Sequence, residues 1–167
     1  MKIIAGSDHA GLALKKRLLE RIRELGHETL DLGTDTTESC DFADYAHAVA
    51  RRVVEEPGSL GLLTCGSGIG MSIAANRHPG VRAALCHTAL EARLTRQHND
   101  ANILVLGSRI LGEEAAIDTL EAFLATPFSG GRHVNRIRKI ELASEDEHQS
   151  APATESSTSH LKSSRRP

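Results

Sequence analysis

The feature that most constrains the fold is a regular alternation of short apolar runs with longer amphipathic segments. Strands are expected at residues 2–5, 27–32, 60–65, 81–86 and 101–106, and helices at residues 12–25, 42–55, 71–77, 89–97 and 113–124. Parallel strands need a crossover between neighbours, and an amphipathic helix is the usual crossover. The alternation therefore predicts an α/β fold, a three-layer αβα sandwich around a five-stranded parallel Rossmann-like sheet.

One domain accounts for most of the chain. Residues 1–143 are expected to form it, ending in a helical pattern from Val134 to Leu142, and they suffice for a core without disulfides or metal. Residues 144–167 hold many serines and charges and one large apolar residue, Leu161, so they are expected to form a disordered polar tail.

Charge and composition argue against several classes of partner. The sequence has 20 basic and 22 acidic residues, a net charge of -2, no Trp and one Tyr, which does not favour a nucleic-acid or membrane surface. No run approaches the roughly 18 apolar residues of a membrane span. Three cysteines without paired spacing indicate a reduced, cytoplasmic protein.

Residues 60–72 carry the strongest chemical signal, an apolar run that ends in Cys65 and continues through Gly66, Gly68 and Gly70. A buried parallel strand would bring Cys65 to the carboxyl edge of the sheet, where glycine-loop amides can surround an anion. The alternative is a tight turn whose glycines only permit close packing.

Cys65 is a candidate for chemistry because of this position. The N-terminus of the following helix favours a thiolate, and loop amides beside it could stabilise an oxyanion, so the stretch indicates proton abstraction next to a carbonyl. The alternative is that it is a small buried hydrophobic residue, which is how we interpret Cys40 and Cys86.

Two other loops are expected at this edge, and two arginines beyond them are candidates for binding. Asp8 and His9 follow the first strand, and residues 107–109 follow the fifth. Arg132 and Arg136 lie four residues apart on one helical face and could bind a phosphate; the alternative is a solvated basic face. No histidine has metal-ligand spacing, so neither a metal nor a cofactor is expected.

His98, in the expected turn 98–100, precedes the fifth strand and therefore lies at the opposite edge of the sheet. If His98 is functional, it must complete the site of a neighbouring subunit across a symmetric interface. The alternative is a histidine that interacts with the carbonyls at a helix C-terminus.

Together these residues form four ordered motifs that resemble the ribose-5-phosphate isomerase type B family, which includes galactose-6-phosphate isomerase subunits. The resemblance covers about Met1 to Leu142. Its motifs are Gly6-Ser7-Asp8-His9-Ala10-Gly11, Cys65-Gly66-Ser67-Gly68-Ile69-Gly70 with Ser72 to Asn76, Arg96-Gln97-His98-Asn99-Asp100-Ala101-Asn102, and Gly130-Gly131-Arg132-His133 with Arg136.

The resemblance implies a metal-free interconversion of ribose 5-phosphate and ribulose 5-phosphate through a cis-enediolate, in a homodimer or tetramer with shared sites. Cys65 would be the base, and His98 of the partner chain would help open the furanose ring. The implied substrate-binding residues are Asp8 and Asn99 at the sugar, Gly66, Ser67, Gly68, Ile69 and Gly70 at the enediolate oxygens, and His9, Arg109, Arg132 and Arg136 at the phosphate.

One departure affects the choice of substrate. The family usually has Tyr-Pro after the aspartate at position 41, whereas this chain has Phe42-Ala43, so a phenolic hydroxyl is absent. A hexose 6-phosphate isomerase, for allose or galactose, is therefore the alternative activity. A non-catalytic sugar-phosphate or nucleotide-binding module is a further alternative, although the G-x-G-x-G spacing fits a dinucleotide site poorly.

Overall fold

The computed structural model describes residues 1–141, so the predicted tail at 144–167 lies outside the described part of the chain. The elements in order are β1 (Lys2–Ser7), α1 (Leu12–Glu24), β2 (Glu28–Asp31), α2 (Phe42–Glu55), β3 (Leu60–Cys65), α3 (Ile69–Ala75), β4 (Ala83–Leu85), α4 (Ala89–Asn99), β5 (Ile103–Gly107), α5 (Glu113–Ala125) and α6 (Arg132–Ile137).

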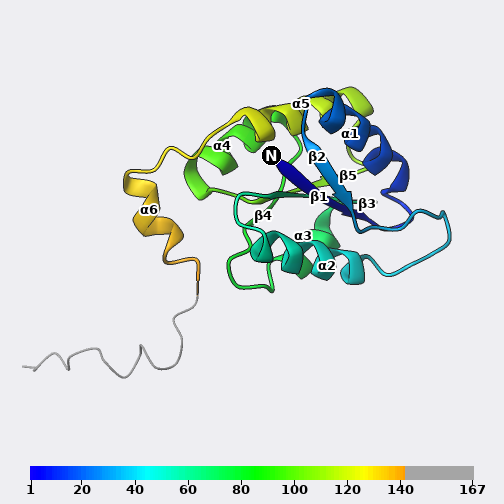
Figure 1. Ribbon diagram of the computed structural model, residues 1–167, viewed down its shortest axis with the longest axis horizontal. Helices are drawn as coiled ribbons and strands as arrows, with labels where there is room; N and C mark the ends of the chain where they lie inside the picture. Colours follow the sequence, from blue (N-terminus) through cyan, green and yellow to red (C-terminus); the bar gives the residue numbers. More distant parts are fainter. Residues whose placement is uncertain (142–167) are drawn as a thin grey trace, which may run out of the picture.

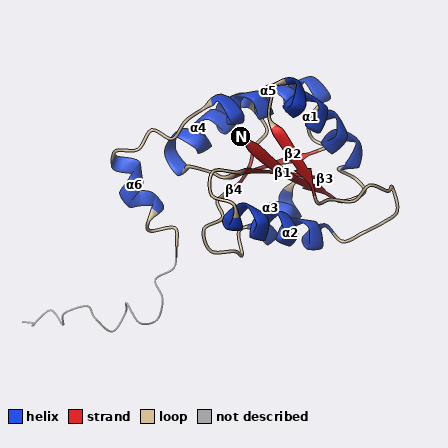
Figure 2. Cartoon of the chain, in the orientation of Figure 1, coloured by secondary structure: helices blue, strands red, loops and turns tan. Residues whose placement is uncertain are grey.

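The strands form one parallel sheet in the order β2-β1-β3-β5-β4. Helices α1, α4 and α5 cover one face, and α2 and α3 cover the other (Figures 1 and 2). This arrangement confirms the predicted α/β sandwich. The register pairs Ser7 with Thr64 and Thr64 with Leu106, so β1, β3 and β5 end at the same level of the sheet.

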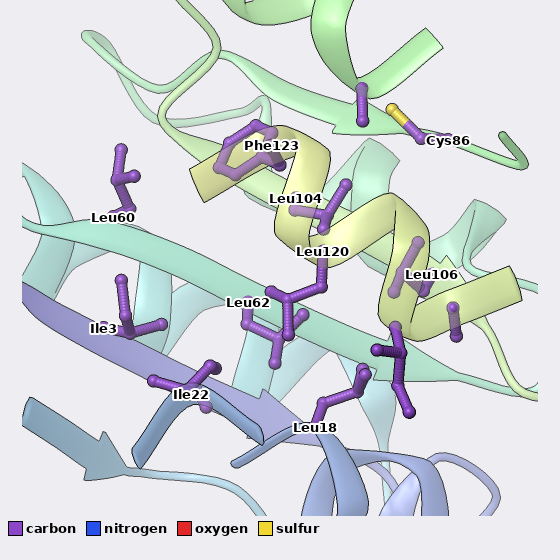
Figure 3. Packing of buried hydrophobic residues seen from close by; sticks show 14 of the residues in the cluster. Ile3, Leu18, Ile22, Leu60, Leu62, Cys86, Leu104, Leu106, Leu120 and Phe123 are labelled. Carbon is purple, nitrogen blue, oxygen red and sulfur yellow. The ribbon is translucent and has the colours of Figure 1, made fainter. Parts of the chain in front are cut away.

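The core is divided between the two faces because successive strand residues point to opposite sides. Leu62 and Leu104 pack with Leu18 and Phe123 under α1, α4 and α5 (Figure 3). The other face packs strand residues against α2 and α3 and includes Cys65.

One local expectation is wrong, and one burial is a new finding. The predicted turn at 98–100 is helical as far as Asn99, because Asp100 adopts a left-handed conformation and ends α4 there. Lys15 on α1 is fully buried, with its ammonium donating to Asp31 Oδ1 and to the Thr34 carbonyl, each at 2.7 Å. Both acceptors come from outside the helix, so helical periodicity could not reveal this burial.

The last helix begins earlier than expected, at Arg132, and stands apart from the sandwich (Figure 1). Its packing is against α4, and the Ser129 amide ties the preceding segment to the Gln97 carbonyl at 3.1 Å. We call residues 128–141 the arm. None of the helices within residues 1–141 is long and apolar enough to cross a membrane.

Candidate active site at the carboxyl edge of the sheet

A cavity of about 360 Å³ lies where β1, β3 and β5 end. It brings together most of the residues predicted for the site. Its lining is Asp8, His9, Ala10, Phe42, Cys65, Gly66, Ser67, Gly70, Arg109 and Ile110. Parallel strands in register place the loops that follow them side by side, which is why residues so distant in sequence meet here.

Cys65 is the last residue of β3 and is only 5% exposed, yet it contributes to the cavity lining. The backbone N–H of Gly68 donates to its Sγ at 3.1 Å. A donor aimed at the sulfur stabilises negative charge there, as a base or nucleophile requires. Cys65 is therefore a thiol at the wall of this cavity, with its sulfur bonded to the glycine loop.

The loop after Cys65 depends on one glycine in particular. Gly68 has a φ of 80°, and a Cβ at this position would lie 2.4 Å from Leu85 Cδ1. Within residues 1–141, the backbone N–H groups of Gly66 and Ser67 have no hydrogen-bond acceptor. Two unpaired donors beside the thiol are the groups that an oxyanion needs.

The three loops are tied to one another by hydrogen bonds. The Thr64 hydroxyl donates to the Gly11 carbonyl at 3.0 Å, and the Ser108 hydroxyl donates to the Ala10 carbonyl at 2.8 Å. The Ser108 amide also donates to the Cys65 carbonyl at 2.8 Å. These bonds hold the cavity on rigid elements, which favours a preorganised site.

His9 is held by a residue whose role differs from the prediction. Cys40 is half-buried, not fully buried, and its backbone N–H donates to His9 Nδ1 at 3.3 Å. Because a backbone N–H can only donate, Nδ1 acts as the acceptor and the ring proton is assigned to Nε2. Asp8 is 7% exposed, and its Oδ1 accepts the Gly11 amide at 2.9 Å.

Arg109 and Phe42 form two walls of the cavity. The Arg109 side chain lies beside Gly66, with its Nε 3.5 Å from where a Cβ would stand. The Phe42 ring lies against Gly70, where a Cβ would be 2.7 Å from ring atom Cε2. The cavity thus has a guanidinium on one side and an aromatic ring without a hydroxyl on another.

His98 is not in this cavity. With Asn99 and Arg136 it lines a separate hollow of about 330 Å³ between α4 and the arm, whose other lining residues are His133, Ile137 and Ile140. Arg132 lies on the same short helix but does not line the hollow. Most of the predicted site residues therefore fall into two groups within the described chain, whereas Gly68, Ile69 and Arg132 line neither cavity.

His133 and Ile110 are site residues that the sequence reasoning missed. His133 was only part of a motif, and its significance comes from stacking on His98, with ring centroids 4.6 Å apart and an interplanar angle of 10°. Ile110 follows Arg109 and lines the first cavity. Its 57% exposure is the only unusual feature of this apolar residue, and exposure is not visible in a sequence.

Comparisons with known proteins match this chain over most of its length. The family model described as Ribose/Galactose Isomerase matches residues 3–140, a range that includes both cavities. A putative sugar phosphate isomerase of Bacillus subtilis is 45% identical over 141 residues, covering 84% of this chain and 95% of that protein. Ribose-5-phosphate isomerase B of Escherichia coli is 42% identical over 139 residues, covering 83% and 93%.

Solved structures of ribose 5-phosphate isomerases are also similar to this chain. The crystal structure of a ribose 5-phosphate isomerase from Thermotoga maritima matches with a TM-score of 0.81 and 50% sequence identity, covering 83% of this chain and 96% of that one.

Proposed function

The chain belongs to the ribose/galactose isomerase family, and from that premise we propose that it is an aldose–ketose isomerase that interconverts D-ribose 5-phosphate and D-ribulose 5-phosphate. The observation that carries the proposal is the position of Cys65. Its sulfur accepts the Gly68 amide in a cavity that also contains Asp8, His9 and Arg109.

The chemistry follows from these groups. The Cys65 thiolate removes the proton from C2 of the open-chain aldose, and the electron pair moves toward O1 to give a cis-enediolate. Within the loop from Gly66 to Gly70, the unpaired N–H groups of Gly66 and Ser67 stabilise the oxygens of this intermediate. The amides of Gly68 and Ile69 are bonded to Cys65 Sγ and Ser67 Oγ and support the loop around them. The proton on O2 then moves to O1, the thiol returns its proton to C1, and the electron pair of the former O2–H bond forms the C2 carbonyl, which yields the ketose. No metal or cofactor takes part in this scheme.

The remaining residues bind and orient the sugar phosphate. Asp8 accepts hydrogen bonds from sugar hydroxyls, and the assigned Nε2–H of His9 donates to the phosphate. Arg109 of the same chain adds a guanidinium. The other phosphate ligands in this proposal, Arg132 and Arg136, lie on the arm.

We further propose that each active site is shared between two subunits of a homodimer or of a tetramer built from dimers. His98 precedes β5 and Cys65 lies level with its end. A five-residue strand spans about 16 Å, so His98 and Cys65 of the same chain are too far apart to act on neighbouring atoms of one substrate molecule. A two-fold axis would bring His98, Asn99, Arg132 and Arg136 of one chain to the Cys65 cavity of the other.

Exposed apolar residues support a second copy of the chain as the partner. On α3, Ile69 and Ile73 are 54% and 57% exposed and lie one turn apart, and on α4, Leu90 and Leu94 are spaced in the same way. These helices flank β4, an edge strand whose three residues are only partly buried. Such a surface stabilises an assembly when a matching apolar surface covers it.

The cytoplasm remains our proposed location. The observation that supports it is that Cys40, Cys65 and Cys86 are all free thiols, as is usual in a reducing compartment.

A hexose 6-phosphate is the second candidate substrate, and one observation favours it. Phe42 places an apolar ring at the cavity wall, where it cannot hydrogen-bond to the sugar. The same proton transfer would act on a longer sugar such as allose 6-phosphate.

One assay tests both candidates. We expect the purified protein, with EDTA present, to convert ribose 5-phosphate with a higher kcat/KM than allose 6-phosphate. A higher value for the hexose would replace the proposed substrate, and the absence of turnover on both sugars would leave a binding module as the remaining interpretation.

A further inference from the structure

His133 is a buried imidazole that the proposed reaction does not use. It is 9% exposed, lies on α6 in the arm, and stacks face to face on His98, which lies on the last turn of α4 and is exposed. The stack is almost parallel, and its 4.6 Å separation is within the range in which aromatic rings attract one another.

The surroundings of His133 favour the neutral ring. Burial lowers its pKa, and the charges of His98, Arg132 and Arg136 lower it further. These three are the titratable and charged groups that act on His133 from α4 and α6. A neutral ring that is held in place is suited to supporting its neighbour rather than to transferring a proton itself.

The stack constrains His98 in one specific way. Contact through the ring face leaves the edge of the His98 ring, which carries both nitrogens, outside the stack. Without it, an exposed histidine at a helix end would rotate among several rotamers, since side chains in solvent change rotamer freely. His133 therefore reduces the conformations of His98 while leaving its reactive atoms accessible.

We propose that His133 is a positioning residue for ring opening, which holds the His98 imidazole at the place and in the plane from which it acts on the sugar of the neighbouring subunit. This inference rests on the proposed function. In ring opening the bond from C1 to the ring oxygen breaks, the ring oxygen takes a proton from His98, and the C1 hydroxyl loses its proton to water as the aldehyde forms. His133 takes no part in these transfers.

The arm that carries His133 is attached to α4 next to His98. The Ser129 amide is bonded to the Gln97 carbonyl, one residue before His98, so the arm is attached next to the residue that it positions. The hollow lined by His98, His133 and Arg136 also places a proposed phosphate ligand beside the stacked pair. Phosphate binding and ring opening would thus be set by the same short helix.

Two readouts separate positioning from general damage. One is the conversion of ribose 5-phosphate, which needs ring opening. The other is deuterium exchange at C1 of ribulose 5-phosphate in D2O, followed by NMR, which needs Cys65 but no ring step, because a 2-ketose phosphorylated on O5 is open-chain. A loss of folded protein lowers both rates by the same factor, so it does not change the ratio of isomerisation to exchange.

The variants are His133→Ala, which removes the ring, and His133→Phe, which keeps a stacking ring without nitrogens. Asn135→Ala is the matched control, because Asn135 is an exposed residue on the same helix that lines neither cavity. We expect His133→Ala to lower isomerisation by about ten- to a hundredfold, as misplaced catalytic groups do. Exchange should change far less, and His133→Phe should recover most of the isomerisation.

Two results would overturn the inference: an isomerisation-to-exchange ratio in His133→Ala equal to that of Asn135→Ala, or no recovery in His133→Phe. If the unaltered protein showed neither isomerisation nor exchange, the proposed function itself would have failed, which is a different outcome.

Discussion

The three cysteines of this chain lie in three different environments, and their chemistry differs accordingly. Burial raises the pKa of the Cys86 thiol to about 12, so this residue stays protonated in the core. Cys40 contacts the ring of His9, with its Sγ 3.9 Å from Nδ1. Only Cys65 combines a cavity wall with a backbone donor aimed at the sulfur.

Replacing Cys65 with Ala should remove the base without removing the binding site. We expect kcat for ribose 5-phosphate to fall by about 10²- to 10⁴-fold, the usual contribution of a positioned base. Binding of the sugar phosphate, measured by calorimetry, should persist. Cys86→Ala is the control and should keep its turnover; undiminished activity in Cys65→Ala would exclude this thiol as the base.

Arg136 should contribute to binding of the substrate phosphate more than to the chemical step. It lines the hollow with His98, whereas Arg138 is an exposed residue of the arm that does not. Loss of a hydrogen bond between charged groups costs about 1.5–3 kcal/mol, so Arg136→Ala should raise KM roughly ten- to a hundredfold with a smaller change in kcat. Steady-state kinetics beside Arg138→Ala measure this, and equal KM values in the two variants would refute the phosphate role.

Among the single elements, periodicity predicted the bounds of α2 but not those of α3. The helix expected at 71–77 spans Ile69–Ala75, because it begins at the left-handed turn of Gly68. Helix α2 spans Phe42–Glu55 as predicted, because its buried residues repeat at helical spacing. Strand β4 is shorter than expected, at Ala83–Leu85, because it lies at the sheet edge and pairs only with β5. Burial of Lys15 depends on acceptors in another segment, so no local pattern indicates it.

The loop between β3 and α3 should tolerate substitution of its left-handed glycine far less well than other turns with a similar backbone. Gly68 and Gly58 both have positive φ, but a Cβ at Gly58 would meet nothing within 4 Å. Gly58→Ala should cost only the strain of the left-handed conformation, about 1 kcal/mol of unfolding free energy. Gly68→Ala should cost more in urea unfolding and lower kcat, because the Cys65 donor moves; equal stability and kcat in both variants would contradict this account.

The contact between α2 and the turn after α3 should make stability depend on pH. His47 Nδ1 and His78 Nε2 are 2.8 Å apart, and burial, His47 and Arg51 lower the pKa of His78 below its usual 6.5. Near and below pH 6.5, His78 binds a proton more readily in the unfolded chain than in the folded chain. The free energy of unfolding should therefore fall as pH decreases from about 7 toward 5.

The measurement is urea unfolding at several pH values, with His78→Asn as the comparison. The variant should lose less stability than the unaltered protein between pH 7 and 5, since one group with a lowered pKa has been removed. Parallel stability curves for the two proteins would show that this pair does not contribute.

For the molecule as a whole, the sequence predicted which loops share an edge of the sheet. It did not predict which side chains from different elements stack or form hydrogen bonds. Asp8, Cys65 and Arg109 share a cavity because parallel strands in register end together, which follows from the alternation alone. The roles of Cys40 and His133 depend on partners from other elements, His9 and His98. Side-chain contacts of this kind arise only when the elements pack.

The same architecture separates His98 from Cys65 within one chain, so the proposed reaction requires an active site that is shared between two chains. Co-expression of Cys65→Ala with His98→Ala chains, carrying different tags, allows purification of the mixed oligomer. One of its two sites then holds both residues, so about half of the wild-type activity is expected for a dimer with two-fold symmetry.

The decisive comparison uses a second mixed oligomer, in which one chain is unaltered and the other carries both Cys65→Ala and His98→Ala. With shared sites, every site in this oligomer lacks one of the two residues. We therefore predict an active first oligomer and an inactive second one. The reverse result, activity only in the second, would show that each chain builds its site alone and would contradict the account.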